Sequence, residues 1–265
     1  MASSFAQYGG ASTSAKQPEG KGYPGQYQYA HHDVESQELL FPGATVSENA
    51  LRWGFIRKVY GLVSFQLAIT AAVSCLMVFH EPTKQAVLES EGIRIVMMLA
   101  PFVGMIPLYC YRHSHPTNLV CLALWTACLS MGVGVACTQF AGDIVVQALL
   151  LTAAITTSLT LYTFWGVRQG KDFGVLGPML FTSLMAMVFW GFMQMFFPMG
   201  DTGRFVYSLV GAVIFSAYLV YDTHEIIKRH SLDEYVWASV ALYLDIINLF
   251  LRMLEILQYL QGGRD

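Results

Sequence analysis

The sequence predicts an all-α integral membrane protein, built as a bundle of seven transmembrane helices. Of its 265 residues, 55% are apolar and only 12% are charged, which is too little charge for a surface that faces water. The chain also contains seven apolar runs that each approach the ~20 residues needed to cross about 30 Å of hydrocarbon. Because backbone polar groups in lipid must be hydrogen-bonded inside the protein, such runs form helices.

A polar segment precedes the apolar runs. Residues 1–50 are rich in Gly, Ser, Gln and Tyr and are predicted to be a disordered cytosolic tail, whereas residues 51–265 are predicted to be the transmembrane domain. Pro101 and Pro107 are expected to kink the second crossing. The connections are short, so neighbouring helices are antiparallel in one bundle. The predicted crossings are 59–79, 95–111, 119–140, 144–165, 175–197, 205–227 and 235–257.

The distribution of Lys and Arg predicts the orientation of these crossings. The amino-terminal segment and the loops on its side of the membrane hold ten of the 15 basic residues, and the opposite side holds five. Cytosolic segments carry the excess of positive charge. We therefore expect a cytosolic amino terminus and, after seven crossings, a carboxyl terminus on the other side.

Charge and cysteine usage argue against several classes of function. A net charge of −3 and the lack of a long basic run disfavour nucleic-acid binding. The five cysteines all lie in apolar runs and none forms a C-x-x-C pair, so we expect buried thiols rather than disulfides or a metal centre. The seven histidines lack the spacing of zinc ligands. No resident cofactor is expected.

The last crossing carries charge at bilayer depth. On a helical wheel its small and polar residues share one face, and these are Ala238, Ala241, Asp245, Asn248, Arg252 and Glu255. A charge at the centre of a bilayer costs about 2.5–3.5 kcal/mol even on the insertion scale, so this polar stripe is predicted to face protein or water. The alternative is an interfacial helix with Arg252 and Glu255 among the headgroups. Asp245, ~15 Å from either end of the segment, disfavours that alternative.

A second acid lies in the sixth crossing. Asp222 is ~8 Å inside the cytosolic end of that helix, and Asp245 is ~7 Å deeper. The small residues Gly211, Ala212 and Ser216 allow the two helices to approach closely. Two carboxylates in contact cannot both stay ionised in a low-dielectric site, so we expect them to share a proton and to latch the helices together. The alternative is that Asp222 caps or snorkels at the interface.

Loss of the shared proton would separate the acids and open a path for cations. Calcium prefers oxygen ligands, so Asp222 and Asp245 are candidate transient calcium ligands as well as a pH-sensitive gate. Arg112 at the end of the second crossing is a candidate for stabilising the ionised pair, with a simple positive-inside anchor as the alternative. His224, two residues after Asp222, is expected to influence the titration of the pair.

Four segments resemble the Lifeguard branch of the Bax-inhibitor motif-containing transmembrane family, over about residues 48–257. They are "LRWGFIRKVYGLVSFQL", "YRHSHPTNL", "FSAYLVYDTHEII" and "DEYVWASVALYLDIINLFLRMLEIL". The resemblance implies seven helices with the last one central, a pH-sensitive calcium leak from intracellular stores, and suppression of programmed cell death. It matches the family's aspartate pair to Asp222 and Asp245, and its basic residue at the end of the second helix to Arg112. Bacterial relatives also carry a carboxylate inside the second helix, and residues 95–111 here contain none.

Other functions remain as alternatives. Tyr221 and Asp222 match half of an intramembrane aspartyl protease pattern, but "LYL" rather than a Gly-rich motif precedes Asp245, so no enzymatic activity is expected. A seven-helix receptor would have its amino terminus outside. The main alternative is a non-conducting regulator that binds calcium channels or death-pathway proteins in the membrane. The resemblance favours the endoplasmic reticulum or Golgi membrane, with the plasma or vacuolar membrane as alternatives.

Overall fold

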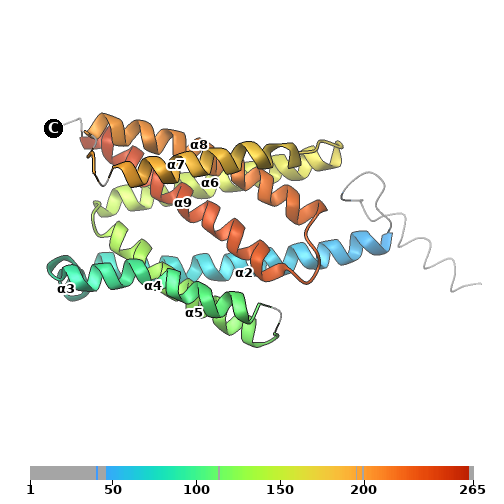
Figure 1. Ribbon diagram of the computed structural model, residues 1–265, viewed down its shortest axis with the longest axis horizontal. Helices are drawn as coiled ribbons and strands as arrows, with labels where there is room; N and C mark the ends of the chain where they lie inside the picture. Colours follow the sequence, from blue (N-terminus) through green and yellow to red (C-terminus); the bar gives the residue numbers. More distant parts are fainter. Residues whose placement is uncertain (1–39, 41–45, 113, 195, 199, 263–265) are drawn as a thin grey trace, which may run out of the picture. The chain divides into compact units, whose positions relative to one another are not determined.

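The structure, a computed structural model, describes residues 40, 46–112, 114–194, 196–198 and 200–262. This part of the chain is all-helical and contains no strand, which confirms the predicted all-α class. Residues 1–39 of the predicted tail lie outside the described residues. The elements are α2 (Val46–Phe79), α3 (Glu81–Glu89), α4 (Glu91–Cys110), α5 (Thr117–Cys137), α6 (Gly142–Arg168), the 3-10 helix η1 (Gly174–Leu176), α7 (Gly177–Met193), α8 (Asp201–Lys228) and α9 (Tyr235–Gly262) (Figure 1).

Six stretches among the described residues are helical, long and apolar enough to cross a membrane. They are Ser47–Phe79, Glu91–Cys110, Thr117–Cys137, Gly142–Arg168, Gly174–Met193 and Asp201–Lys228. Each corresponds to one of the first six predicted crossings. The seventh prediction, 235–257, coincides with α9, which is 28 residues long but carries Asp245, Arg252 and Glu255 and is not one of the six. The chain is therefore a multi-pass helical membrane protein.

Two helical features were not predicted. The first helix begins at Val46 rather than at residue 59, because the segment before the apolar run is itself amphipathic: Phe55, Ile56 and Val59 are buried while Arg57 and Lys58 are exposed. The short helix α3 follows α2 directly. It has a proline in its first turn, where the missing N–H costs no hydrogen bond.

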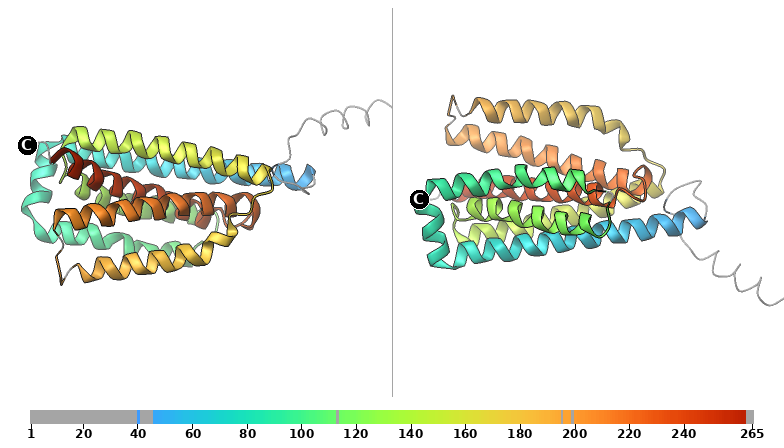
Figure 2. Two further views of the ribbon diagram at one scale, coloured as in Figure 1. Left: turned by 90° about the horizontal axis from the view of Figure 1, so that it is seen from above. Right: turned by 60° about the horizontal axis from the view of Figure 1, so that its bottom comes forward.

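The helices fall into two groups that α9 joins. In one group α5 packs against α2 and α4, and in the other α8 packs against α6 and α7. The most extensive contact in the described bundle is between α8 and α9, and α9 also packs on α6, α2 and α5 (Figures 1 and 2). Fourteen of the 28 residues of α9 are buried, more than in any other described helix. Half of the helix that carries the polar stripe is thus buried in the bundle.

Buried hydroxyls tie α9 to the first group. The Tyr243 hydroxyl lies 2.7 Å from the Thr70 hydroxyl of α2, which lies 2.9 Å from the Ser130 hydroxyl of α5. One turn away, Gln66 Nε2 donates to Thr126 Oγ1 at 3.1 Å. Between helices in a membrane such hydrogen bonds contribute about 0.6 kcal/mol each on average, because the unfolded chain in the membrane also finds hydrogen-bond partners.

Candidate functional site

The interface of α8 and α9 is close because its residues are small. Ser208, Gly211 and Ala212 recur at helical spacing along the buried face of α8. A Cβ atom added to Gly211 would lie 2.9 Å from Cδ of Arg252 on α9, closer than ordinary van der Waals contact. Glycine therefore lets the aliphatic part of an arginine cross this interface.

The two predicted acids lie on adjacent helices at this interface. Asp222 of α8 and Asp245 of α9 line the same cavity. Asp245 is only 6% exposed, and its Oδ2 atom has no hydrogen-bond partner among the described residues. Two carboxyl groups can form a hydrogen bond only when one of them holds a proton. A proton shared between Asp222 and Asp245 stays a prediction.

A cavity of about 340 Å³ lies against the acid pair. Its walls come from α7, α8 and α9, and both Asp222 and Asp245 line it. The stripe residues Asn248 and Arg252 line the same cavity, as do Tyr207 and Tyr218 of α8. The cavity is thus lined by two carboxyl groups and one guanidinium.

Two contacts, with Glu255 and Tyr207, hold Arg252 at the cavity. Its Nη1 donates to Glu255 Oε2 at 2.8 Å, and the Ser208 hydroxyl donates to the same carboxylate oxygen. Its guanidinium carbon lies 4.9 Å from the centroid of the Tyr207 ring. The Nε atom of Arg252 is buried and has no acceptor among the described residues. Only part of the donor capacity of this arginine is used inside the protein.

The residues of the polar stripe on α9 have different surroundings. Asn248 Nδ2 donates to the carbonyl of Leu244 at 2.9 Å, which turns this side chain back onto its own helix. Glu255 is 42% exposed and pairs with Arg252. The stripe therefore faces α8 and the cavity at Asp245, Asn248 and Arg252, and reaches the more exposed end of the helix at Glu255.

Arg112 is placed away from the residues that line the cavity. It follows the end of α4, and its guanidinium carbon lies 4.6 Å from the ring centroid of Tyr109. Its carbonyl accepts a hydrogen bond from Asn118 Nδ2 at 3.2 Å. The arginine that the structure brings to the cavity of the acid pair is Arg252. A role for Arg112 in stabilising the ionised pair stays a prediction.

His224 faces a loop rather than the cavity. Its ring is fully buried, with Nε2 3.0 Å from Asp172 Oδ1 and Nδ1 3.3 Å from Glu225 Oε1. The Phe173 ring packs edge-on against it, with ring centroids 5.9 Å apart. His224 thereby fastens the loop between α6 and η1 to α8. Its influence on the titration of the acid pair stays a prediction.

The loop contact includes charged residues that the sequence did not single out. Arg229 Nη2 lies 3.5 Å from Asp172 Oδ2, and Arg229 Nη1 lies 3.4 Å from Glu225 Oε1. The pKa of Asp172 is lowered from its usual 3.8, first because the backbone N–H of Gly174 donates to it at 2.9 Å, and further because His224 and Arg229 are near. No short-range pattern links residues 172 and 224, so only the folded structure reveals this contact.

The acid pair supplies few ligands for a metal ion. Among the described residues no group of three or more His, Cys, Asp or Glu side chains could hold a metal ion. Asp222 and Asp245 supply two carboxyl groups, and calcium takes six to eight oxygen ligands. Water would have to complete the shell of an ion held there.

Comparison with known proteins assigns the chain to a family. The sequence model described as "Inhibitor of apoptosis-promoting Bax1" matches residues 52–262. The chain is 51% identical over 222 residues to the BI1-like protein of Arabidopsis thaliana, covering 84% of this chain and 87% of that protein. It is 42% identical over 231 residues to Protein LIFEGUARD 2 of Arabidopsis thaliana, covering 86% of this chain and 96% of that protein. It is 34% identical over 208 residues to the Golgi anti-apoptotic protein of vaccinia virus, covering 78% of this chain and 86% of that protein.

The family match extends over nearly all of the described bundle, from the first turns of α2 to the last residue of α9. The acid pair and the cavity both lie within it. The chain therefore belongs to the Bax-inhibitor family of membrane proteins that regulate cell death, in its Lifeguard branch.

Proposed function

We propose that this protein is a pH-sensitive calcium leak channel of an intracellular membrane that suppresses programmed cell death. In this proposal α9 is the seventh crossing and the other six surround it. The observation that carries the proposal is that Asp222 and Asp245, on adjacent helices, line one cavity of about 340 Å³.

The acid pair acts as the gate. While the two carboxyl groups share a proton, their hydrogen bond holds α8 against α9 and no ligand oxygens are offered to a cation. When the pH rises and the shared proton leaves, two carboxylates in a low-dielectric site repel each other. The helices then separate, and oxygen ligands become available for calcium as the transported ion, bound transiently at Asp222 and Asp245.

Arg252 provides the countercharge within the same cavity. A positive charge near the pair stabilises the ionised carboxylates and lowers the pH at which the gate opens. The same charge opposes the passage of cations, so the leak is limited even when the pair is ionised. Both effects depend on Glu255 and Tyr207 keeping the guanidinium in place.

The cellular setting follows the relatives and the charge distribution. The vaccinia virus relative is named a Golgi anti-apoptotic protein, which supports a Golgi or endoplasmic reticulum membrane and a role in restraining cell death. The excess of Lys and Arg on the amino-terminal side supports a cytosolic amino terminus. A lower resting calcium content of the store would reduce the calcium available to trigger death.

Reconstitution tests this proposal. We expect the purified full-length chain in calcium-loaded vesicles to release calcium at a rate that rises with pH through one midpoint. Asp222→Asn and Asp245→Asn should each remove that step, whereas Asp233→Asn, an exposed carboxylate before α9, should keep it. Absence of flux in the intact protein, or an unchanged step in both pair variants, would refute the channel and leave the non-conducting regulator of calcium channels or death-pathway proteins.

A further inference from the structure

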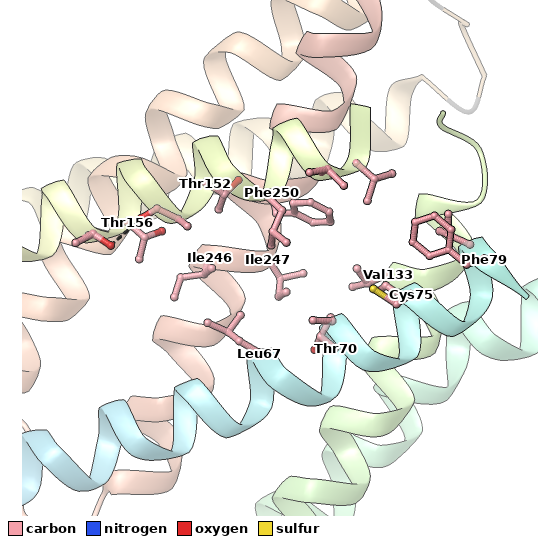
Figure 3. Close-up of a pocket in the computed structure, with 18 residues that line it drawn as sticks. Leu67, Thr70, Cys75, Phe79, Val133, Thr152, Thr156, Ile246, Ile247 and Phe250 are labelled. Carbon is pink, nitrogen blue, oxygen red and sulfur yellow. Dashed lines mark hydrogen bonds between the residues drawn. The ribbon is translucent and has the colours of Figure 1, made fainter. Parts of the chain in front are cut away.

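A second space lies on the opposite side of the bundle core from the acid cavity. It is a crevice of about 310 Å³ between α2 and α6, with Ile246, Ile247 and Phe250 of α9 among its lining residues. Figure 3 shows Leu67 and Thr70 of α2 on one side of the space and Thr152 and Thr156 of α6 on the other, with Ile246 and Ile247 between them. α9 therefore separates this crevice from the cavity that contains Asp245.

Small side chains create the crevice. Ala71 and Cys75 line it from α2, and Ala153 and Thr157 line it from α6. The two helices both pack on α9 but share no extensive contact of their own. Short side chains on the facing surfaces leave the space between the helices unfilled.

The crevice extends along α2 as far as Phe79, the last residue of that helix. Phe79 lines the crevice and lies near Gly142 at the start of α6. Between Leu67 and Phe79 the wall runs for twelve residues, or ~18 Å. That length is close to the ~15 Å depth of one leaflet's hydrocarbon.

The walls of the crevice offer carbon rather than polar atoms. The hydroxyls of Thr152 and Thr157 donate to carbonyls of α6 one turn earlier, both at 2.8 Å. The Thr70 hydroxyl is engaged with Gln66 and Tyr243. At the rim, Val146 and Leu149 are about half exposed, on a helix apolar enough to span the membrane. Ser74 Oγ and Thr156 Oγ1 have no hydrogen-bond partner among the described residues, but both atoms are buried within the walls. The crevice therefore opens toward hydrocarbon and presents a mainly apolar surface.

The dimensions of the crevice select among apolar occupants. The crevice has a volume of about 310 Å³ along a wall of ~18 Å. A helix ~10 Å across occupies about 1,400 Å³ over the same length, several times that volume. A helix from a second copy of the chain or from another protein is therefore too wide, whereas a single extended hydrocarbon chain fits.

We propose that this crevice is a binding site for one acyl chain of a membrane lipid, drawn from the leaflet at which α2 ends. The chain enters beside Phe79 with its carboxyl end and reaches toward Leu67 with its methyl end. It fills the space between α2 and α6 and packs on the face of α9 that carries Ile246, Ile247 and Phe250. The site is independent of whether the acid pair conducts calcium.

Photo-crosslinking tests the proposal with the intact chain in lipid nanodiscs. The probe is a phosphatidylcholine that carries a diazirine at a chosen carbon of one acyl chain, and mass spectrometry locates the labelled residues. We expect a diazirine near the methyl end to label the region of Leu67 and Thr156, and one near the carboxyl end to label the region of Phe79 and Val146. The order of labelling along α2 reports the leaflet of origin.

Matched phenylalanine substitutions provide the control. Ala71→Phe and Ala153→Phe fill the crevice from opposite walls, so each should reduce crevice labelling at least fivefold. Ala72→Phe and Ala154→Phe add the same bulk at the adjacent exposed positions, which do not line the crevice, and should leave labelling unchanged. Two variants on different helices keep the test decisive if one of them fails to fold.

Three outcomes would overturn the proposal. The first is labelling spread evenly over the exposed faces of α4 and α7 with no enrichment in the crevice. The second is crevice labelling that survives both Ala71→Phe and Ala153→Phe. The third is capture of a second copy of the chain through crevice residues, which would mean that a protein helix covers this face.

Discussion

The guanidinium of Arg252 on α9 lies 4.9 Å from the ring centroid of Tyr207 on α8, at the wall of the cavity that Asp222 and Asp245 also line. This contact joins the same two helices as the acid pair. It places a permanent positive charge seven residues, or ~10 Å, along α9 from Asp245. The cavity therefore contains its own countercharge, and the protonation of the acids and the position of the arginine are electrostatically linked.

Replacing Arg252 should shift the pH dependence of calcium release. At ~10 Å and an effective dielectric constant of about 20, a unit charge stabilises an ionised carboxylate by about 1.6 kcal/mol, which corresponds to about one pH unit. Without that charge the pair loses its shared proton only at higher pH. We expect Arg252→Gln to move the midpoint of flux upward by up to one unit, because Glu255 already offsets part of the charge.

The charge rather than the shape of the side chain should account for that shift. Arg252→Lys keeps the charge and should keep the midpoint within a few tenths of a unit. Arg204→Gln removes an exposed arginine from the first turn of α8 and serves as the control. A midpoint that stays in place in Arg252→Gln, in vesicles whose flux is otherwise normal, would contradict the assigned role.

Tyr243→Phe should weaken the attachment of α9 to α2 and α5. The substitution removes one hydroxyl and hardly changes the volume, so it isolates the hydrogen bond to Thr70, which in turn contacts Ser130. The hydroxyls of Thr70 and Ser130 still donate to backbone carbonyls of their own helices, which limits the loss of stability. We expect the free energy of unfolding to fall by about 0.5–1.5 kcal/mol, measured by denaturant titration in mixed micelles.

The control for this measurement is Tyr111→Phe, which removes a hydroxyl from a tyrosine that is 50% exposed. Its effect should stay within about 0.5 kcal/mol. A loss in Tyr243→Phe no larger than that of the control would mean that the buried hydroxyls add nothing to the packing of α9.

The parts of this site that follow from periodicity were predictable, and those that depend on loop packing were not. The spacing of Asp245, Asn248 and Arg252 along one helical face indicated an inward stripe. The apolar runs before them located the first six helices. The pairing of Asp172 with His224 joins a loop to a distant helix, so no local pattern predicts it. The identity of the arginine nearest the acids likewise depended on which helices pack together.

The crevice between α2 and α6, which is lined mainly by apolar residues, also could not be predicted from the sequence. Alanines at 71 and 153 read in the sequence as ordinary lipid-facing or interface residues. Only the approach of both helices to α9 turns them into facing walls. The early start of α2 was detectable in principle, because Phe55, Ile56 and Val59 have helical spacing. The charged residues Arg57 and Lys58 beside them interrupt the apolar run, so hydropathy alone places the start of the crossing at residue 59.

Asp172→Asn should destabilise the protein at neutral pH. In acid the difference in stability between the variant and the intact protein should disappear. The pKa of Asp172 is lowered below 3.8, first by the hydrogen bond from Gly174 and then by His224 and Arg229. A carboxylate whose pKa is lower in the folded state stabilises the fold above its unfolded pKa. That contribution disappears as the pH falls through the folded pKa. The pH range over which this stabilisation is lost therefore begins near pH 4 and extends to lower values.

The apparent thermal midpoint in detergent measures this effect. Because Asp172 is largely exposed, solvent screens its pairs, and at pH 6 we expect a decrease of only about 1–3 °C in Asp172→Asn. At pH 3 the intact protein should lose most of its advantage over the variant, because its own Asp172 is then becoming protonated. Asp233→Asn, which removes an exposed carboxylate outside this cluster, should differ from the intact protein by the same small amount at both pH values. An Asp172→Asn deficit that is equal at pH 6 and pH 3 would mean that the loop is held by packing of Phe173 rather than by the charge of Asp172.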